Sequence, residues 1–139
     1  MVSKIEVDAL SGVSSAGVMT VVGEGGSTTT NLQQGLCKAW ISVSHQLTSI
    51  NDSFNISSLD DDGTGDGGVH ITNDMNSAEY SILTGTDDGD SGGSIHSIDI
   101  TQGTQAAGTY DFESAAVDAS TNRTNADTES YHAIQGDLA

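Results

Sequence analysis

Basic residues and cysteine are scarce in this sequence, and proline is absent. The shortage of basic residues and of cysteine excludes several kinds of partner and site. Only three of the 139 residues are lysine or arginine, against twenty acidic ones, so the formal net charge is −17. Such a charge repels phosphate backbones and anionic lipids, and we expect neither a nucleic-acid partner nor a membrane partner. Cysteine occurs once, at Cys37, which excludes an internal disulfide and a cysteine-based zinc site. We expect Cys37 to be a small buried side chain rather than a nucleophile.

Long apolar runs and large side chains are also in short supply. The opening residues alternate in polarity, which predicts neither a signal peptide nor a transmembrane segment. The length corresponds to one domain, and the aromatic residues are one tryptophan, two phenylalanines and three tyrosines. A core built from so few large side chains is thin, and burial against partner subunits is one way to supply the missing apolar area.

Glycine is abundant, with 17 copies, and Ser, Thr, Asn and Asp fill much of the remaining sequence. Short alternating runs, separated by clusters of these residues, predict strands and turns, and no convincing helical period is present. The pattern predicts an all-β fold with a single antiparallel sandwich or barrel. The expected strands are 4–10, 17–22, 38–44, 49–56, 68–72, 78–83, 94–101, 108–114 and 129–136, with one helical turn at 32–35.

The chain is expected to have two parts of different character. Residues 1–34 are predicted to be an extended attachment segment that includes a polar Gly/Ser/Thr linker at 23–31, and residues 35–139 to be the β-sandwich domain. The apolar side chains of the segment that we expect to dock onto a partner are Ile5, Val7, Leu10, Val18 and Val21. The side chains expected in the core of the sandwich are Trp40, Ile41, Phe54, Ile71, Tyr80 and Phe112.

Several short motifs follow one another in a distinctive order. They are KAWI at 38–41, DSFNISS at 52–58, DGTGD at 62–66, VHIT at 69–72 and MNSAEY at 75–80. Their order and spacing resemble a domain of tail-fibre-like and other virion proteins from marine and environmental tailed phages. The opening SKIEVDAL at 3–10 is similar to the N-termini of such proteins. One departure is Gly67-Gly68, which stands where the family has bulkier residues at the start of a strand.

The resemblance implies a non-enzymatic virion structural protein, without a cofactor, at the surface of the particle. The main expectation is a short fibre-like appendage of the tail or head that forms a homotrimer. Residues 1–34 would attach it to coat, portal or tail proteins. Two alternatives remain open: a capsid decoration (cement) protein that stabilises the head, and an adhesin that binds a host surface glycan.

A protease motif occurs in the second half of the chain, where GDSGG at 89–93 matches the nucleophile sequence of chymotrypsin-like serine proteases. Ser91 would need a histidine such as His45 and an orienting carboxylate such as Asp60. Two complete barrels do not fit in 139 residues, and the motif lies in a run of Asp, Gly and Ser where such a string arises readily. We therefore predict no catalytic site.

Metal and sugar sites are the other hypotheses. Asp60, Asp62 and Asp66 are weak calcium candidates because hard oxygen ligands crowd there, but a solvated turn is favoured. The four histidines lie on separate segments without a paired-ligand motif, which favours surface or interface positions over a metal site; they are His45, His70, His96 and His132. Trp40 and the tyrosines could form a platform that stacks on carbohydrate, although core positions are favoured for the large aromatic residues.

Overall fold

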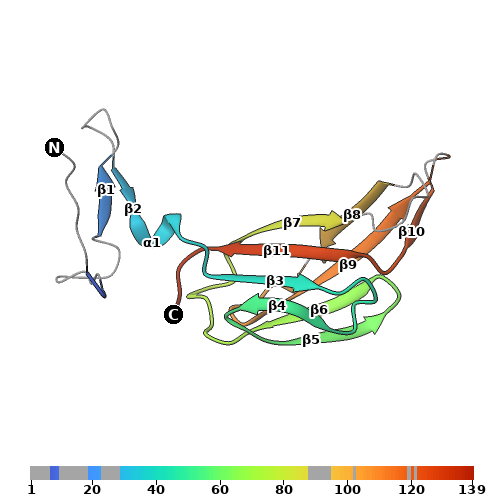
Figure 1. Ribbon diagram of the computed structural model, residues 1–139, viewed down its shortest axis with the longest axis horizontal. Helices are drawn as coiled ribbons and strands as arrows, with labels where there is room; N and C mark the ends of the chain where they lie inside the picture. The colour runs from blue at the N-terminus through green and yellow to red at the C-terminus, as the bar shows by residue number, and fades with distance from the viewer. Residues whose placement is uncertain are drawn as a thin grey trace. The chain divides into compact units, whose positions relative to one another are not determined.

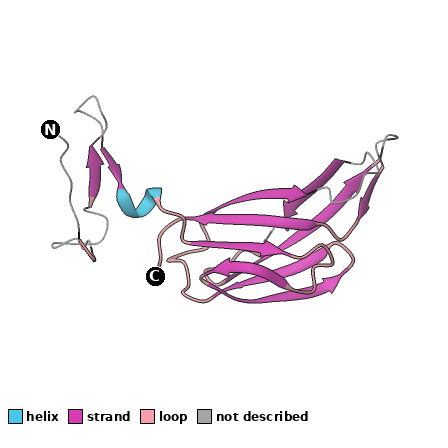
Figure 2. Cartoon of the chain, in the orientation of Figure 1, coloured by secondary structure: helices cyan, strands magenta, loops and turns pink. Residues whose placement is uncertain are grey.

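A computed structural model describes residues 7–9, 19–22, 29–87, 95–101, 103–118, 120 and 122–139. The chain divides into two compact units, Met1–Leu36 and Cys37–Ala139, each with its own strand pairing (Figure 1). The boundary expected from the sequence lay two residues earlier. Nearly all regular structure is β, and the described residues contain one helical turn (Figure 2).

The first unit contains a small antiparallel pair followed by that helical turn. Strand β1 (Thr20–Val22) pairs with β2 (Thr29–Asn31), and α1 (Leu32–Gly35) follows directly, at the residues where the sequence predicts a helical turn. The Leu32 amide donates a hydrogen bond to the Met19 carbonyl at 2.8 Å. Residues 29–31 were expected to be linker, and that expectation is wrong because their threonines, which favour strands, pair with β1.

The residues expected to dock onto a partner lie in this first unit. Val7 and Val21 are exposed, whereas Ile5, Leu10 and Val18 lie outside the described residues. Residues 7–9 are not in a strand, contrary to the expected strand 4–10, whose remaining residues also lie outside the described part.

The second unit is an antiparallel β-sandwich rather than a closed barrel, with two sheets packed face to face (Figure 1). One sheet has four strands in the order β4 (Ile50–Phe54), β3 (Ala39–Val43), β11 (Glu129–Gln135) and β7 (Ser81–Asp87). The other has five strands, in the order β10 (Arg123–Asn125), β9 (Thr109–Val117), β6 (Asp66–Ile71) and β5 (Ile56–Gly63), with β8 (Ile95–Ile100) also paired to β9.

The core lies between the two sheets and follows the two-residue period of the strands. Strand β3 contributes Ala39, Ile41 and Val43, strand β9 contributes Tyr110 and Phe112, and all five are at most 1 % exposed. The remaining buried apolar side chains are Leu47, Val69, Ile71, Met75, Tyr80, Ala115 and Ile134. Each large one contributes roughly 1.5–3 kcal/mol by leaving water. Gly67 belongs to this packing, because a Cβ there would lie 2.9 Å from the Phe112 ring.

Three expectations about burial fail. Ile41, Ile71, Tyr80 and Phe112 are in the core, but Trp40 and Phe54 are exposed on the outer face of the four-stranded sheet. The reason is alternation: since Ala39, Ile41 and Val43 face inward, Trp40 must face outward, and Phe54 is paired directly opposite it. Cys37 is exposed as well, because it precedes β3 and lies outside the sandwich interior.

The chain passes from one sheet to the other at Asn55. The sequence predicts one strand over 49–56, but Asn55 has a φ of 58° and separates β4 from β5. Asparagine tolerates this left-handed conformation better than most residues. The Asn55 side chain stabilises this connection through two hydrogen bonds. Its amide nitrogen donates to the Lys38 carbonyl at 3.1 Å, and its amide oxygen accepts from the Asn73 backbone N–H at 2.9 Å.

Candidate functional site

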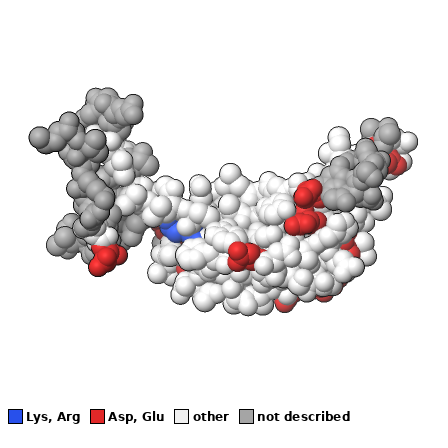
Figure 3. Space-filling model, in the orientation of Figure 1, with Lys and Arg blue, Asp and Glu red and all other residues white. Residues whose placement is uncertain are grey.

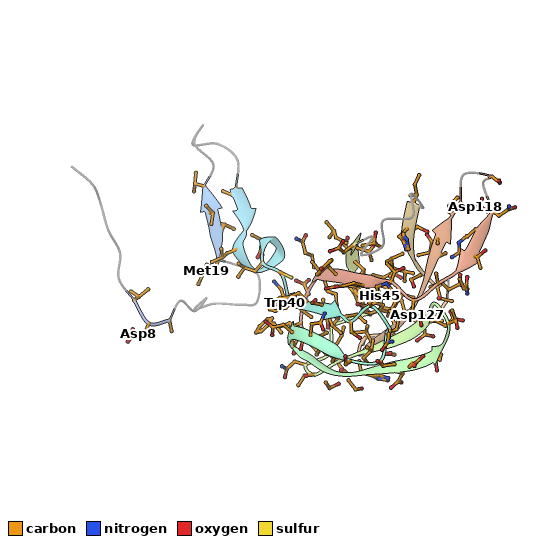
Figure 4. All side chains as sticks on the ribbon, turned by 45° about the vertical axis from the view of Figure 1, so that its right-hand side comes forward. Asp8, Met19, Trp40, His45, Asp118 and Asp127 are labelled. Carbon is orange, nitrogen blue, oxygen red and sulfur yellow. The ribbon has the colours of Figure 1, made fainter. Side chains whose placement is uncertain are left out.

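An apolar row crosses the outer face of the four-stranded sheet. The strand register places Phe54, Trp40, Ala133 and Leu83 side by side on β4, β3, β11 and β7. The exposed fractions are 56 % for Phe54, 37 % for Trp40 and 53 % for Leu83. Figure 4 shows the Trp40 side chain projecting from β3. Single exposed apolar residues are ordinary, but four in register across a whole sheet form a continuous patch.

The next row along the strands is more polar. It consists of Asp52, Ser42, Tyr131 and Gly85, in the same strand order. Tyr131 is 42 % exposed and extends the aromatic surface, so we define the platform as Phe54, Trp40, Ala133, Leu83 and Tyr131. Uncharged atoms cover most of β3 and β11 in the view of Figure 3.

A hollow of about 360 Å³ opens on this platform. Its lining includes Trp40, Ser42, Leu83, Gly85, Tyr131 and Ala133. Gly85 leaves room within it, since a Cβ built there would have no neighbour within 4 Å. The hollow is therefore lined by aromatic and aliphatic side chains, with uncovered backbone at Gly85, and it is open to a ligand of modest size.

Hydrogen-bonding groups border the platform on one side. The Tyr131 hydroxyl donates to Glu129 Oε1 at 2.9 Å, and the Asn51 amide donates to the same oxygen at 3.3 Å. The hydrogen bond with Glu129 raises the pKa of the Tyr131 phenol. Asp87 is paired with Glu129 across β7 and β11, and Asp52 lies opposite Ser42. This border is consequently rich in oxygen acceptors and negative charge.

The outer face of the five-stranded sheet has a different character. Strand pairing places Asp66, Glu113 and Asp99 in one row. Arg123 donates to Asp99 at 3.2 Å and to Glu113 at 3.3 Å, and the group is largely exposed. Exposed ion pairs of this kind contribute at most about 1 kcal/mol each. This acidic face is therefore a solvated surface.

The calcium candidates are not gathered into a site. Asp60 Oδ2 lies 2.7 Å from His70 Nε2, Asp62 is exposed in β5, and Asp66 begins β6. The turn predicted in this stretch is confirmed at Thr64 and Gly65, which connect the antiparallel strands β5 and β6, whereas Asp60 and Asp62 lie within β5 itself. Among the residues that the structure describes, no group of three or more His, Cys, Asp or Glu side chains could hold a metal ion.

The histidines are engaged separately rather than with one another. His96 lies 2.7 Å from the Thr128 hydroxyl, His70 lies beside Asp60, and His45 is exposed in a loop. Asp60 therefore lies beside His70 and not beside His45, contrary to the histidine-before-aspartate order of chymotrypsin-like proteases. Ser91 and the rest of its motif lie outside the described residues.

His132 is buried in the core, where it shares a hydrogen bond of 2.8 Å with the Tyr110 hydroxyl. Its ring also meets the Phe112 ring edge-on, with centroids 4.7 Å apart. Burial lowers the pKa of His132 to about 4, because the charged imidazolium would lose its hydration. Burial likewise raises the pKa of Tyr110, and it raises that of Tyr80 to about 12. These groups are neutral packing residues of the core.

Comparisons with known proteins give no relative: no family model, no curated protein and no solved structure matches the chain. Within the described part of the chain, none of the helical structure is long and apolar enough to cross a membrane.

Only part of the platform is predicted from the sequence. Trp40 and the tyrosines are candidates for carbohydrate stacking, although Trp40 and Phe54 are expected in the core, and neither Leu83 nor Ala133 is singled out. One signal was available, because Trp40 alternates with buried residues in β3 and Tyr131 does the same in β11. Which strands lie side by side depends on long-range pairing, which the alternation does not encode.

Proposed function

We propose that this protein is a non-enzymatic structural protein at the surface of a tailed-phage particle, a short fibre-like appendage of the tail or head. The motif resemblance, the net charge of −17 and the division into a small N-terminal unit and a β-sandwich support the proposal. The platform is the surface through which the sandwich meets its partner.

The continuous platform is the observation that carries this proposal. Soluble monomers rarely leave a sheet face with a continuous apolar row of three exposed side chains and one half-buried alanine unless the face has a partner. A structural or binding role accounts for this apolar surface and its shallow hollow more directly than catalysis does, because its border supplies hydrogen-bond acceptors rather than an arranged nucleophile and base.

The attachment to the particle is assigned to residues 1–34, which would meet coat, portal or tail proteins. We propose a homotrimer, which the resemblance implies.

A capsid decoration protein is the second candidate, supported by the same compact sandwich with its apolar face. A host-glycan adhesin is the third, and the exposure of Trp40 and Tyr131 favours it.

Counting copies per purified particle by quantitative mass spectrometry, against the major coat protein, tests the proposal. A few to a few tens of copies fits a tail or vertex appendage, whereas hundreds would replace it with capsid decoration. Absence from the particles would contradict both. Deleting residues 1–34 should leave a folded domain that no longer joins particles.

A further inference from the structure

We propose that the platform is a binding site for neutral carbohydrate, a glycan of uncharged hexose or N-acetylhexosamine units. The inference rests on the proposed function only in taking the platform as the binding surface of the sandwich. The ligand class is neutral sugar, as opposed to an anionic sugar or a second copy of the chain.

The arrangement of the two rows matches the two chemical sides of a pyranose ring. Such a ring presents C–H groups on one face and hydroxyl groups around its edge. The apolar row offers Trp40 and Phe54 to the C–H face, and aromatic faces are the usual apolar partners of such groups. The hydroxyl edge then meets the more polar row, where Asp52, Ser42 and Tyr131 lie across three neighbouring strands.

The polar border is composed mainly of acceptors that suit sugar hydroxyls. Glu129 already accepts from Asn51 and from the Tyr131 hydroxyl, so its position is held before a ligand arrives. A pre-positioned acceptor loses less conformational entropy when it binds. A hydroxyl-rich ligand can donate to such carboxylates, whereas a purely apolar partner would leave them desolvated and unpaired.

Charge distinguishes the neutral glycan from other occupants. Asp52, Asp87 and Glu129 border the platform, and none of the described residues that line the hollow is lysine or arginine. Lys38, which directly precedes β3, is only 8 % exposed. Sialic or uronic acids would meet repulsion there. A second copy docking face to face would set these carboxylates against their own counterparts.

Titration of the full-length protein with defined oligosaccharides tests the inference. The panel contains glucose, galactose, mannose and N-acetylglucosamine oligomers, with uronic-acid oligomers as anionic counterparts, each to about 10 mM. Trp40 is the only tryptophan in the chain, so its fluorescence reports directly on the platform. We expect a neutral oligomer to produce a saturable blue shift, and its anionic counterpart to bind at least about tenfold more weakly.

Two variants probe the same surface in opposite ways, with calorimetry as the readout. Trp40→Ala removes the stacking ring, and Gly85→Val fills the hollow at a position with no neighbour within 4 Å, where folding should be preserved. Both should weaken binding by roughly tenfold or more. Ile95→Ala is the matched control, because Ile95 is 73 % exposed on the other sheet.

Two results would overturn the inference. One is that no neutral oligomer of the panel binds, or that binding survives both platform variants. The other is that Trp40 in the free protein is already shielded from acrylamide and that Gly85→Val dissociates an oligomer, which would assign the platform to contacts between copies. Neither result affects the copy number on particles, so failure of this inference is distinguishable from failure of the proposed virion role.

Discussion

His132 shows how a single buried residue links packing to pH. Its ring fills space between Tyr110 and Phe112 and is 2 % exposed, so the folded protein contains it in the neutral form. Its Nε2 atom has no hydrogen-bond partner among the residues that the structure describes, which makes adding a second proton to the ring still more costly. This role could not be predicted from the sequence, because a histidine in an alternating run is equally compatible with a surface position.

The stability of the sandwich should therefore fall in mild acid. The unfolded chain takes up a proton on His132 near pH 6.5, while the folded chain resists until about pH 4. The free energy of unfolding should then decrease as the pH drops from 6.5 to 4, by up to about 3 kcal/mol. Urea unfolding at several pH values measures this change for the wild type and for His132→Leu.

For His132→Leu, the free energy of unfolding should change less between pH 6.5 and 4 than it does for the wild type. This holds whatever the stability of the variant at neutral pH. His45→Gln is the control, because it removes an exposed histidine from a loop and leaves the core unchanged. Equal slopes for the wild type and His132→Leu would contradict the assignment, and the acid sensitivity would then belong to carboxylates.

At the scale of elements, alternation predicted the sandwich strands well and their ends poorly. Strands β3, β6, β9 and β11 lie where the pattern placed them, because a half-buried strand repeats every two residues. Strand β10 was missed since Arg123-Thr124-Asn125 carries no apolar residue. The break at Asn55 was missed because Phe54 and Ile56 look like neighbours in an ordinary strand, although each belongs to a different sheet.

The connection between β4 and β5 should depend on the side chain of Asn55 as well as on its backbone. Asn55→Ala loses the bonds to Lys38 and Asn73 and forces alanine into positive φ, so we expect a loss of about 2–4 kcal/mol in unfolding free energy. Asn55→Gly restores the backbone freedom but not the bonds, and should recover about 1 kcal/mol of that loss. Chemical denaturation of both variants measures the difference, and equal losses would show that the backbone conformation contributes nothing.

For the whole molecule, unbalanced charge is the dominant electrostatic feature. Twenty acidic residues face three basic ones, and among the described residues Arg123 is the one that forms a small ion-pair group on the acidic face. Repulsion between carboxylates should therefore outweigh the attraction of these few pairs, and dissolved salt should screen it.

The melting temperature at neutral pH should rise as sodium chloride is increased from about 0.05 to 0.5 M. A gain of about 1 kcal/mol corresponds to roughly 4–8 °C for a domain near this size. Differential scanning calorimetry measures the shift, and sucrose at matched osmolality controls for effects unrelated to charge. A melting temperature that falls with salt would indicate that attractive ion pairs dominate instead.

The two outer faces of the sandwich both carry carboxylates, so charge alone does not orient the molecule on a charged material. Asp66, Glu113 and Asp99 lie on one face, and Asp52, Asp87 and Glu129 border the platform on the other. A cationic resin or sensor chip should therefore adsorb the protein through either face and hide Trp40 in part of the copies. Immobilisation for a binding assay should instead use one defined attachment point, and the exposed thiol of Cys37 supplies it.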